Sequence, residues 1–224
     1  MNDRILVIAA HPDDELLGCG GTAALHVRRG DAVTVVIACE GESLRYGPEG
    51  VGQARHIGEA AATLGVRDVR QLGFPDQGLD RVTLTDVIRP LENVVREVRP
   101  RVVYCQFGGD LNRDHQLLFQ ATLVATRPPE TCIEAVYAFD TASSTEWAYP
   151  RSFTADTWVD ITDTLDLKIA AMACYESEVR AYPHPRSLEA LRHRARAWGN
   201  QHCLDAAEAF MTVRRTLRNG QTPV

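Results

Sequence analysis

Two short stretches of the sequence combine histidine with carboxylates. The first, VIAAHPDDELLG, occupies residues 7–18, and the second, GGDLNRDHQ, occupies residues 108–116. Each follows an apolar run of the kind that forms a strand buried on both faces of a parallel sheet. Histidine and carboxylate are the side chains that bind catalytic zinc and that move protons near neutral pH. The two stretches therefore predict one site for metal and proton-transfer chemistry.

The spacing within these stretches suggests a division of roles. His11 and Asp14 are three residues apart across a turn, and His115 can approach from the second stretch. Two imidazoles and one carboxylate leave a fourth position open for water, as in a catalytic zinc site. Asp13 is directed elsewhere by the turn and is available as a base toward that water, whose pKa zinc lowers to about 7. Glu15 is expected to support the turn.

A structural explanation of the same residues competes with this one. Asp13 or Asp14 could cap the helix that follows, and Asp114 could cap the next helix, leaving His115 an ordinary first-turn residue. Either stretch alone would often be structural, because short motifs are permissive. Their occurrence at two matching strand ends favours the functional interpretation.

The surrounding pattern predicts a fold that brings the two stretches together. Residues 4–10 and 32–39 are near-continuous aliphatic runs, and the helical pattern between them ends at Gly30, which gives a βαβ unit. In such sheets ligands bind at the carboxyl ends of the strands. Further strands are expected at 68–74, 101–107, 132–139 and 157–161, and helices at 53–66, 87–98 with Pro90 in the first turn, 117–125, 163–179, 186–198 and 204–217. We predict a single α/β domain spanning 1–224, a Rossmann-like three-layer sandwich with a mostly parallel sheet and helices on both faces.

Composition narrows the classes of partner. The net charge of −6 and pI of about 5.6 provide no basic field for nucleic acid. No segment approaches the ~20 apolar residues of a membrane span, and the N-terminal apolar run is too short for a signal peptide. The six cysteines form no CxxC motif and mostly lie in apolar runs. We expect a reduced, cytoplasmic protein without nucleic-acid or membrane partners; the sequence leaves its oligomeric state open, a homo-oligomer included.

These motifs resemble a known family. AHPDDE followed downstream by DxNxDH resembles the PIG-L/LmbE family of zinc-dependent de-N-acetylases, which remove acetyl groups from N-acetylglucosamine-type sugars. LGFPDQGLD, YPHPRS and AEAF are also similar to stretches of bacterial members, so the resemblance spans most of the chain.

The resemblance implies specific roles by position. It assigns one zinc ion per chain to His11, Asp14 and His115, and the general base to Asp13. It also implies substrate contacts from Arg55 and Asp76.

Two other residues are candidates for contact with the substrate. Some family members have a histidine where this chain has Asn112, and asparagine cannot donate a proton at neutral pH. Asp13 would then serve as base toward water and as acid toward the leaving amine. Arg186, in the proline-rich YPHPRS stretch, could hold a phosphate or carboxylate, although a structural role fits it equally well.

The sequence thus predicts a zinc hydrolase that deacetylates an N-acetylated amino sugar or its conjugate. A zinc amidase acting on a non-sugar N-acyl molecule and a non-catalytic ligand-binding module are the alternatives. Ligand type alone does not separate Zn²⁺ from Fe²⁺ or Co²⁺. The substrate depends on loops near 43–53 and 140–155, whose shape the sequence does not give.

Overall fold

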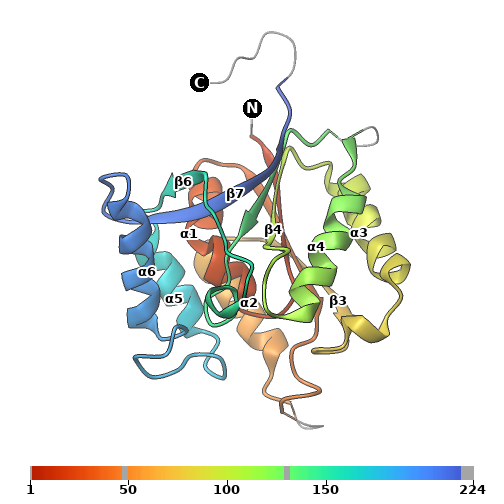
Figure 1. The fold of residues 1–224 in the computed structure, drawn as a ribbon, viewed down its shortest axis with the longest axis horizontal. Coiled ribbons are helices and arrows are strands. Elements are labelled where there is room, and N and C mark those ends of the chain that lie inside the picture. Colours follow the sequence, from red (N-terminus) through yellow and green to blue (C-terminus); the bar gives the residue numbers. More distant parts are fainter. Residues whose placement is uncertain (1, 47–49, 129–131, 218–224) are drawn as a thin grey trace.

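A seven-stranded sheet forms the centre of the computed structural model, which describes residues 2–46, 50–128 and 132–217 (Figure 1). The strand order is β3-β2-β1-β4-β5-β7-β6. β1 to β5 run parallel, and β7 runs antiparallel to both β5 and β6. The strands are β1 (Arg4–Ala9), β2 (Ala32–Cys39), β3 (Asp68–Phe74), β4 (Val102–Gln106), β5 (Ala135–Phe139), β6 (Thr157–Asp160) and β7 (Ala207–Arg215).

Helices cover both faces of this sheet, which confirms the predicted three-layer α/β fold. α1, α2, α5 and α6 pack on one face, and α3 and α4 pack on the other (Figure 1). The helices are α1 (Asp14–Arg28), α2 (Gln53–Leu64), α3 (Leu84–Val98), α4 (Arg113–Ala125), α5 (Leu165–Ala173) and α6 (Leu188–Asn200), with 3-10 turns η1 (Leu79–Arg81) and η3 (Thr145–Trp147). The central strand β1 is buried beyond its first residue because both of its faces carry aliphatic side chains.

Helix α1 lies very close to the sheet. A Cβ atom at Gly18 would stand 2.0 Å from the Phe139 ring of β5, so no other residue fits there without displacing that ring. A buried ion pair fixes the same helix: Lys168 Nζ lies 2.7 Å from Glu208 Oε1 and donates to the Leu17 carbonyl at 2.9 Å. Glu208, on β7, also accepts the N–H groups of Gly21 and Thr22. The C-terminal half of the chain therefore holds the helix that begins at the first polar stretch.

Three predicted elements differ from the observed ones. Residues 204–217 were expected to be helical, yet 207–215 form β7, because pairing with β5 and β6 overrides the helix propensity of alanine, glutamate and methionine. Pro90 lies inside α3 rather than in its first turn, since Thr83 caps the helix at an earlier point by accepting from Asp86 N–H. Helix α5 ends at Ala173, so the last part of the expected helix 163–179 is replaced by a loop.

The carboxyl ends of the parallel strands meet at one edge of the molecule, the lower edge in Figure 1. The loops that leave β1 and β4 at this edge contain the two polar stretches, as the strand-end rule predicts. Among the described residues no helix has the length and apolar character needed to cross a membrane.

Candidate active site

Three side chains from the two polar stretches converge beneath this edge. Asp14 Oδ2 lies 3.2 Å from His11 Nδ1 and 3.3 Å from His115 Nε2, and these two nitrogens are 3.3 Å apart. All three side chains are buried. His11 and Asp14 come from the turn after β1 and the start of α1, and His115 comes from the first turn of α4.

This triangle has the size of one face of a tetrahedral zinc site. Two ligand atoms at about 2.0–2.1 Å from a tetrahedral zinc ion stand about 3.3–3.4 Å apart. The three measured separations of 3.2, 3.3 and 3.3 Å match that spacing without any movement of the side chains. The donor set therefore fits a divalent metal with a fourth position open toward the cavity.

Carboxylates stand behind both histidines. Asp114 Oδ2 lies 3.1 Å from His11 Nε2, and Asp110 Oδ1 lies 3.2 Å from His115 Nδ1. Carboxylates in this position fix the ring orientation of metal-binding histidines and make the ligating nitrogen more basic. Asp110 is in turn held by the hydroxyls of Ser144 and Thr145, while Gln106 Nε2 donates to Asp14 at 2.8 Å.

The electrostatics of the site favour a positive charge at its centre. Burial disfavours a charged imidazole, but hydrogen bonds to Asp114 and Asp14 outweigh it and raise the pKa of His11 to about 9. For His115 burial is likewise outweighed, by Asp14 and Asp110, and its pKa rises to about 10. The carboxylates around the two histidines therefore favour a positive charge at this point, which suits a divalent cation.

Asp13 occupies an unusual turn conformation beside the triangle. Its φ of 104° is rare for a residue with a side chain, and its carboxylate makes no cap bond to α1. Burial and the neighbouring Asp14 charge raise the pKa of the Asp13 carboxyl, and Arg186 opposes them from 3.3 Å. The helix-capping explanation of Asp13 is therefore wrong, and its side chain is available to the cavity.

Asn112 lies in the cavity wall and also caps α4. Its Oδ1 accepts the Asp114 N–H at 2.8 Å, and its Nδ2 donates to Gln77 Oε1 at 3.1 Å. The expectation that Asp114 caps this helix is thus wrong, because Asn112 does so. One N–H of Asn112 remains for a ligand, but both ends of its amide are already oriented by protein groups.

A cavity of about 160 Å³ opens over these residues. Its floor is formed by His11, Asp13, Asp14 and His115, and its rim by Arg45, Ser143, Ser144 and Arg186. Leu17, Gln77, Asn112, Thr141 and Ala142 complete the lining. Below, the floor means His11, Asp13, Asp14 and His115, and the rim means Arg45, Ser143, Ser144 and Arg186.

The two rim arginines share one buried carboxylate. Glu178 Oε2 lies 3.0 Å from Arg45 Nη1 and 2.7 Å from Arg186 Nη1. Arg45 Nε also donates to Asp76 at 3.1 Å. These ion pairs fix the positions of both guanidinium groups over the cavity.

Of the four residues predicted from the sequence to contact the substrate, two line the cavity, one lies behind it and one lies away from it. Arg186 and Asn112 line the cavity, and Asp76 is buried behind it, with its Oδ1 3.7 Å from His11 Nε2. Arg55 is on the exposed side of α2, where it pairs with Glu59 at 3.0 Å, and it does not line the cavity.

Sequence reasoning did not find several residues that complete the site. They are Arg45, Gln77, Gln106, Asp110, Ser144 and Glu178. Gln106 could have been noticed as a polar amide in the apolar strand that precedes GGDLNRDHQ. Asp110 lies within GGDLNRDHQ itself. The loop residues Arg45 and Ser144 belong to no recognisable motif.

A larger groove of about 770 Å³ lies away from the strand ends, between the start of α5 and the end of α6. Within the described part of the chain, groups of at least three side chains with metal-binding spacing occur only around His11. The candidate metal-binding side chains His11, Asp14 and His115 therefore line the smaller cavity and not the larger groove.

The chain is similar to known proteins over most of its length. Residues 6–126 match the PIG-L family, described as GlcNAc-PI de-N-acetylase. The chain is 31% identical to the 1D-myo-inositol 2-acetamido-2-deoxy-alpha-D-glucopyranoside deacetylase of Mycolicibacterium smegmatis, over 82% of this chain and 83% of that protein.

Two solved structures share the fold over nearly the whole chain. The conserved protein TT1542 from Thermus thermophilus superposes with a TM-score of 0.79 at 26% identity, covering 99% of this chain and 100% of that one. GalB, the 4-carboxy-2-hydroxymuconate hydratase from Pseudomonas putida, has a TM-score of 0.77 at 23% identity, with the same coverage. The fold thus also carries a different reaction, and the family assignment rests on the sequence match: this chain belongs to the PIG-L family of de-N-acetylases.

Proposed function

We propose that this protein is a metal-dependent N-deacetylase that hydrolyses the acetamido group of an amino sugar or its conjugate. The observation that carries the proposal is the convergence of His11, Asp14 and His115 on one point, with Asp13 beside them, in a member of this family. The M. smegmatis relative is named for an acetamido sugar joined to inositol, which supports a sugar conjugate as the substrate.

His11, Asp14 and His115 would hold the metal, which we propose to be zinc. When bound, the metal would activate water and stabilise negative charge on the carbonyl oxygen. Asp13 accepts a proton from the attacking water and returns it to the departing nitrogen as the C–N bond breaks, which yields acetate and a free amine. One carboxylate thus serves as base and acid, because Asn112 cannot donate a proton.

The rim would orient the sugar above this chemistry. A cavity of about 160 Å³ is smaller than the ~300–1,000 Å³ of typical ligand pockets, so it holds the acetamido end and leaves the rest of a conjugate on the rim. The N–H groups of Arg45 and Arg186 and the hydroxyls of Ser143 and Ser144 offer hydrogen bonds to sugar hydroxyls there.

Turnover by the metal-reconstituted protein tests the proposal. The purified chain would be stripped with a chelator, reloaded separately with Zn²⁺, Fe²⁺ or Co²⁺, and offered N-acetylglucosamine, its glycosides and simple N-acetyl amides. We expect acetate and free amine in equal amounts from a sugar substrate, and none from the stripped protein. Activity on simple amides alone would indicate a non-sugar amidase, and metal binding without release of acetate from any substrate would contradict the proposal.

A further inference from the structure

Glu15 is a buried carboxylate next to the metal triangle that has no place in the proposed reaction. Both of its oxygens are occupied by protein groups. Oε2 accepts the backbone N–H of Asp13 at 3.1 Å, and Oε1 accepts the hydroxyl of Tyr175 at 2.6 Å. Tyr175 is fully buried and lies 160 residues further along the chain, just after α5.

The Asp13 backbone needs such support. A residue with a Cβ atom at a φ of 104° is strained and persists only where its surroundings hold it. Asp13 precedes the first turn of α1, where N–H groups have no partner within the helix. The Glu15 carboxylate is the acceptor for this N–H, and the Tyr175 hydroxyl fixes the carboxylate in turn.

The segment after α5 holds Asp13 at a second point. Arg186, from the same segment, places Nη1 3.3 Å from the Asp13 carboxylate. Tyr175 therefore acts on the main chain of Asp13 through Glu15, and Arg186 acts on its side chain. The turn that contains the general base is aligned by residues from the far end of the sequence.

We propose that Glu15 and Tyr175 are positioning residues: they hold Asp13 in its left-handed conformation and so direct its carboxylate toward the reacting water. This role rests on the proposed function of Asp13. It predicts that loss of the Tyr175 hydroxyl changes the rate of the reaction without changing metal content or substrate binding.

Tyr175→Phe and Glu15→Gln test this proposal, with Tyr104→Phe as the matched control. Tyr104 is also a buried tyrosine, but its hydroxyl contacts His26 in the last turn of α1, away from the cavity. Each variant would be compared with the unaltered protein in kcat, KM, bound metal and the exchange rate of the Asp13 amide hydrogen measured by NMR.

We expect Tyr175→Phe to lower kcat about 10-fold and Glu15→Gln up to about 100-fold, the scale of a small misplacement of a reacting group. KM and metal stoichiometry should stay near the unaltered values, the Asp13 amide should exchange faster in both variants, and Tyr104→Phe should change none of these quantities.

Unchanged kcat and unchanged Asp13 exchange in the folded variants would overturn the proposal. If Tyr175→Phe does not fold, Glu15→Gln gives the same test, because it keeps the side-chain volume. An unaltered protein without deacetylase activity would contradict the proposed function, whereas the exchange rate of the Asp13 amide would still decide whether Glu15 and Tyr175 hold the turn.

Discussion

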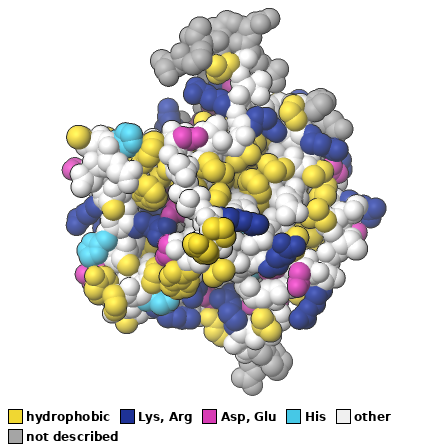
Figure 2. All heavy atoms as spheres, in the orientation of Figure 1, with side chains coloured by type: hydrophobic (Ala, Val, Ile, Leu, Met, Phe, Trp, Pro, Cys, Tyr) yellow, Lys and Arg dark blue, Asp and Glu magenta, His cyan; other side chains and the backbone are white. Residues whose placement is uncertain are grey.

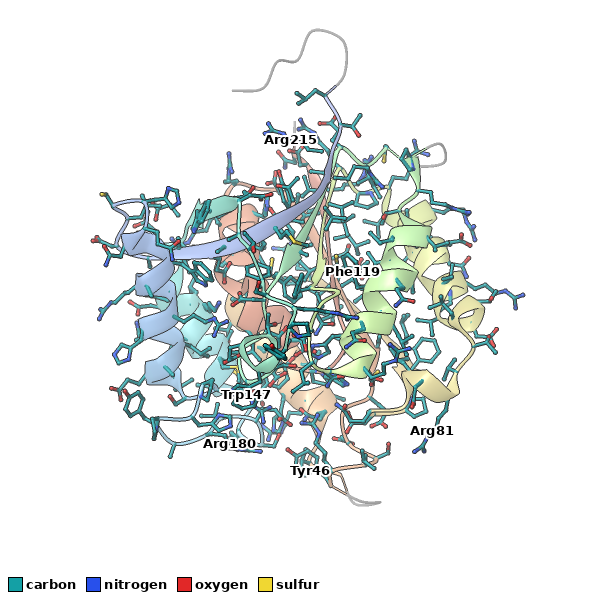
Figure 3. All side chains as sticks on the ribbon, in the orientation of Figure 1. Tyr46, Arg81, Phe119, Trp147, Arg180 and Arg215 are labelled. Carbon is teal, nitrogen blue, oxygen red and sulfur yellow. The ribbon has the colours of Figure 1, made fainter. Side chains whose placement is uncertain are left out.

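The floor and the rim of the cavity are built in different ways. The floor comes from the ends of two adjacent parallel strands, β1 and β4, and its side chains are buried and surrounded by carboxylates. The rim comes from longer loops, at the end of the molecule where Figure 3 shows Tyr46, Trp147 and Arg180. Large exposed apolar side chains lie in these loops: Leu44, Trp147, Tyr149 and Tyr182.

This difference indicates which part of the molecule sets each property. The floor has one arrangement, fixed by the sheet, and suits a reaction common to a family. The rim can change without disturbing the strands, as loops generally do, and suits the choice of substrate. In Figure 2 hydrophobic side chains gather in the middle of the visible face, over the segment between β5 and β6 that supplies part of the rim.

Removing a floor ligand should have the largest effect. His115→Ala should lose bound metal and reduce activity by well over ~10²-fold. Loss of a carboxylate that only orients a metal-binding histidine typically costs about 10–100-fold, and loss of the ligand itself should cost more. Metal analysis and a deacetylation assay would measure both. His193→Ala, an exposed histidine on α6, is the control, and normal metal binding by His115→Ala would show that the ligand set is wrong.

Neutralising the base should separate chemistry from metal binding. Asp13→Asn is nearly isosteric and should lower kcat by at least ~10²-fold, the usual contribution of a general base, while metal content stays unchanged. Steady-state kinetics at saturating metal would measure the change. Full activity in this variant would assign the base to another group.

The carboxylate behind His115 should show a smaller and different effect. Asp110→Asn should weaken metal affinity about 10–100-fold, because the histidine loses the partner that orients it. Metal titration of the stripped protein would measure the affinity. Activity should recover at high metal concentration, and a loss that metal does not restore would mean that Asp110 acts beyond the orientation of His115.

Arg45, which lines the cavity, and Arg55, which the family resemblance implied as a substrate contact, can be compared directly. Arg45→Gln should raise KM about 10-fold by removing a charged hydrogen-bond donor from the rim, with metal content unchanged. Arg55→Gln should leave KM unchanged, since Arg55 pairs with Glu59 on the outside of α2. Measuring the KM of both variants on one substrate would show which arginine contacts it. A raised KM for Arg55→Gln with an unchanged KM for Arg45→Gln would indicate that Arg55, and not Arg45, binds the substrate.

The smallest effect is expected from the apolar part of the rim. Trp147→Ala should raise KM a few-fold for conjugates with an aromatic or acyl group and leave plain N-acetylglucosamine unaffected, given about 25 cal/mol per Å² of buried apolar surface. Parallel kinetics on the two kinds of substrate would show the difference. Equal changes for both would place Trp147 outside a substrate-specific surface.

The sequence predicted the floor better than the rim for a physical reason. Residues directly after a buried parallel strand have their position fixed by the sheet, so His11 and His115 could be brought together from spacing and the strand-end rule. Arg45 and Ser144 depend on loop conformations that result from many weak contacts. Part of the expected specificity loop 43–53, residues 47–49, lies outside the described residues.

The same limit explains the errors in the fold. Residues 207–215 contain strong helix formers. They form a strand because they pair with β5 on one side and β6 on the other. The loop that replaces the end of the expected helix 163–179 contains Tyr175 and Glu178. Local propensity therefore failed where contacts distant in sequence decide the structure, which is also where the rim is formed.

The position of β7 has a consequence for how the chain folds during synthesis. β5 pairs on one side with β4 and on the other with β7, which follows much later in the sequence. Until 207–215 leave the ribosome, the growing chain has the floor residues but presents β5 as an unpaired edge strand, open to other strands. Completion of the sheet therefore needs the last strand, and because Glu208 on that strand accepts two N–H groups of α1, the same strand also completes the contacts of α1.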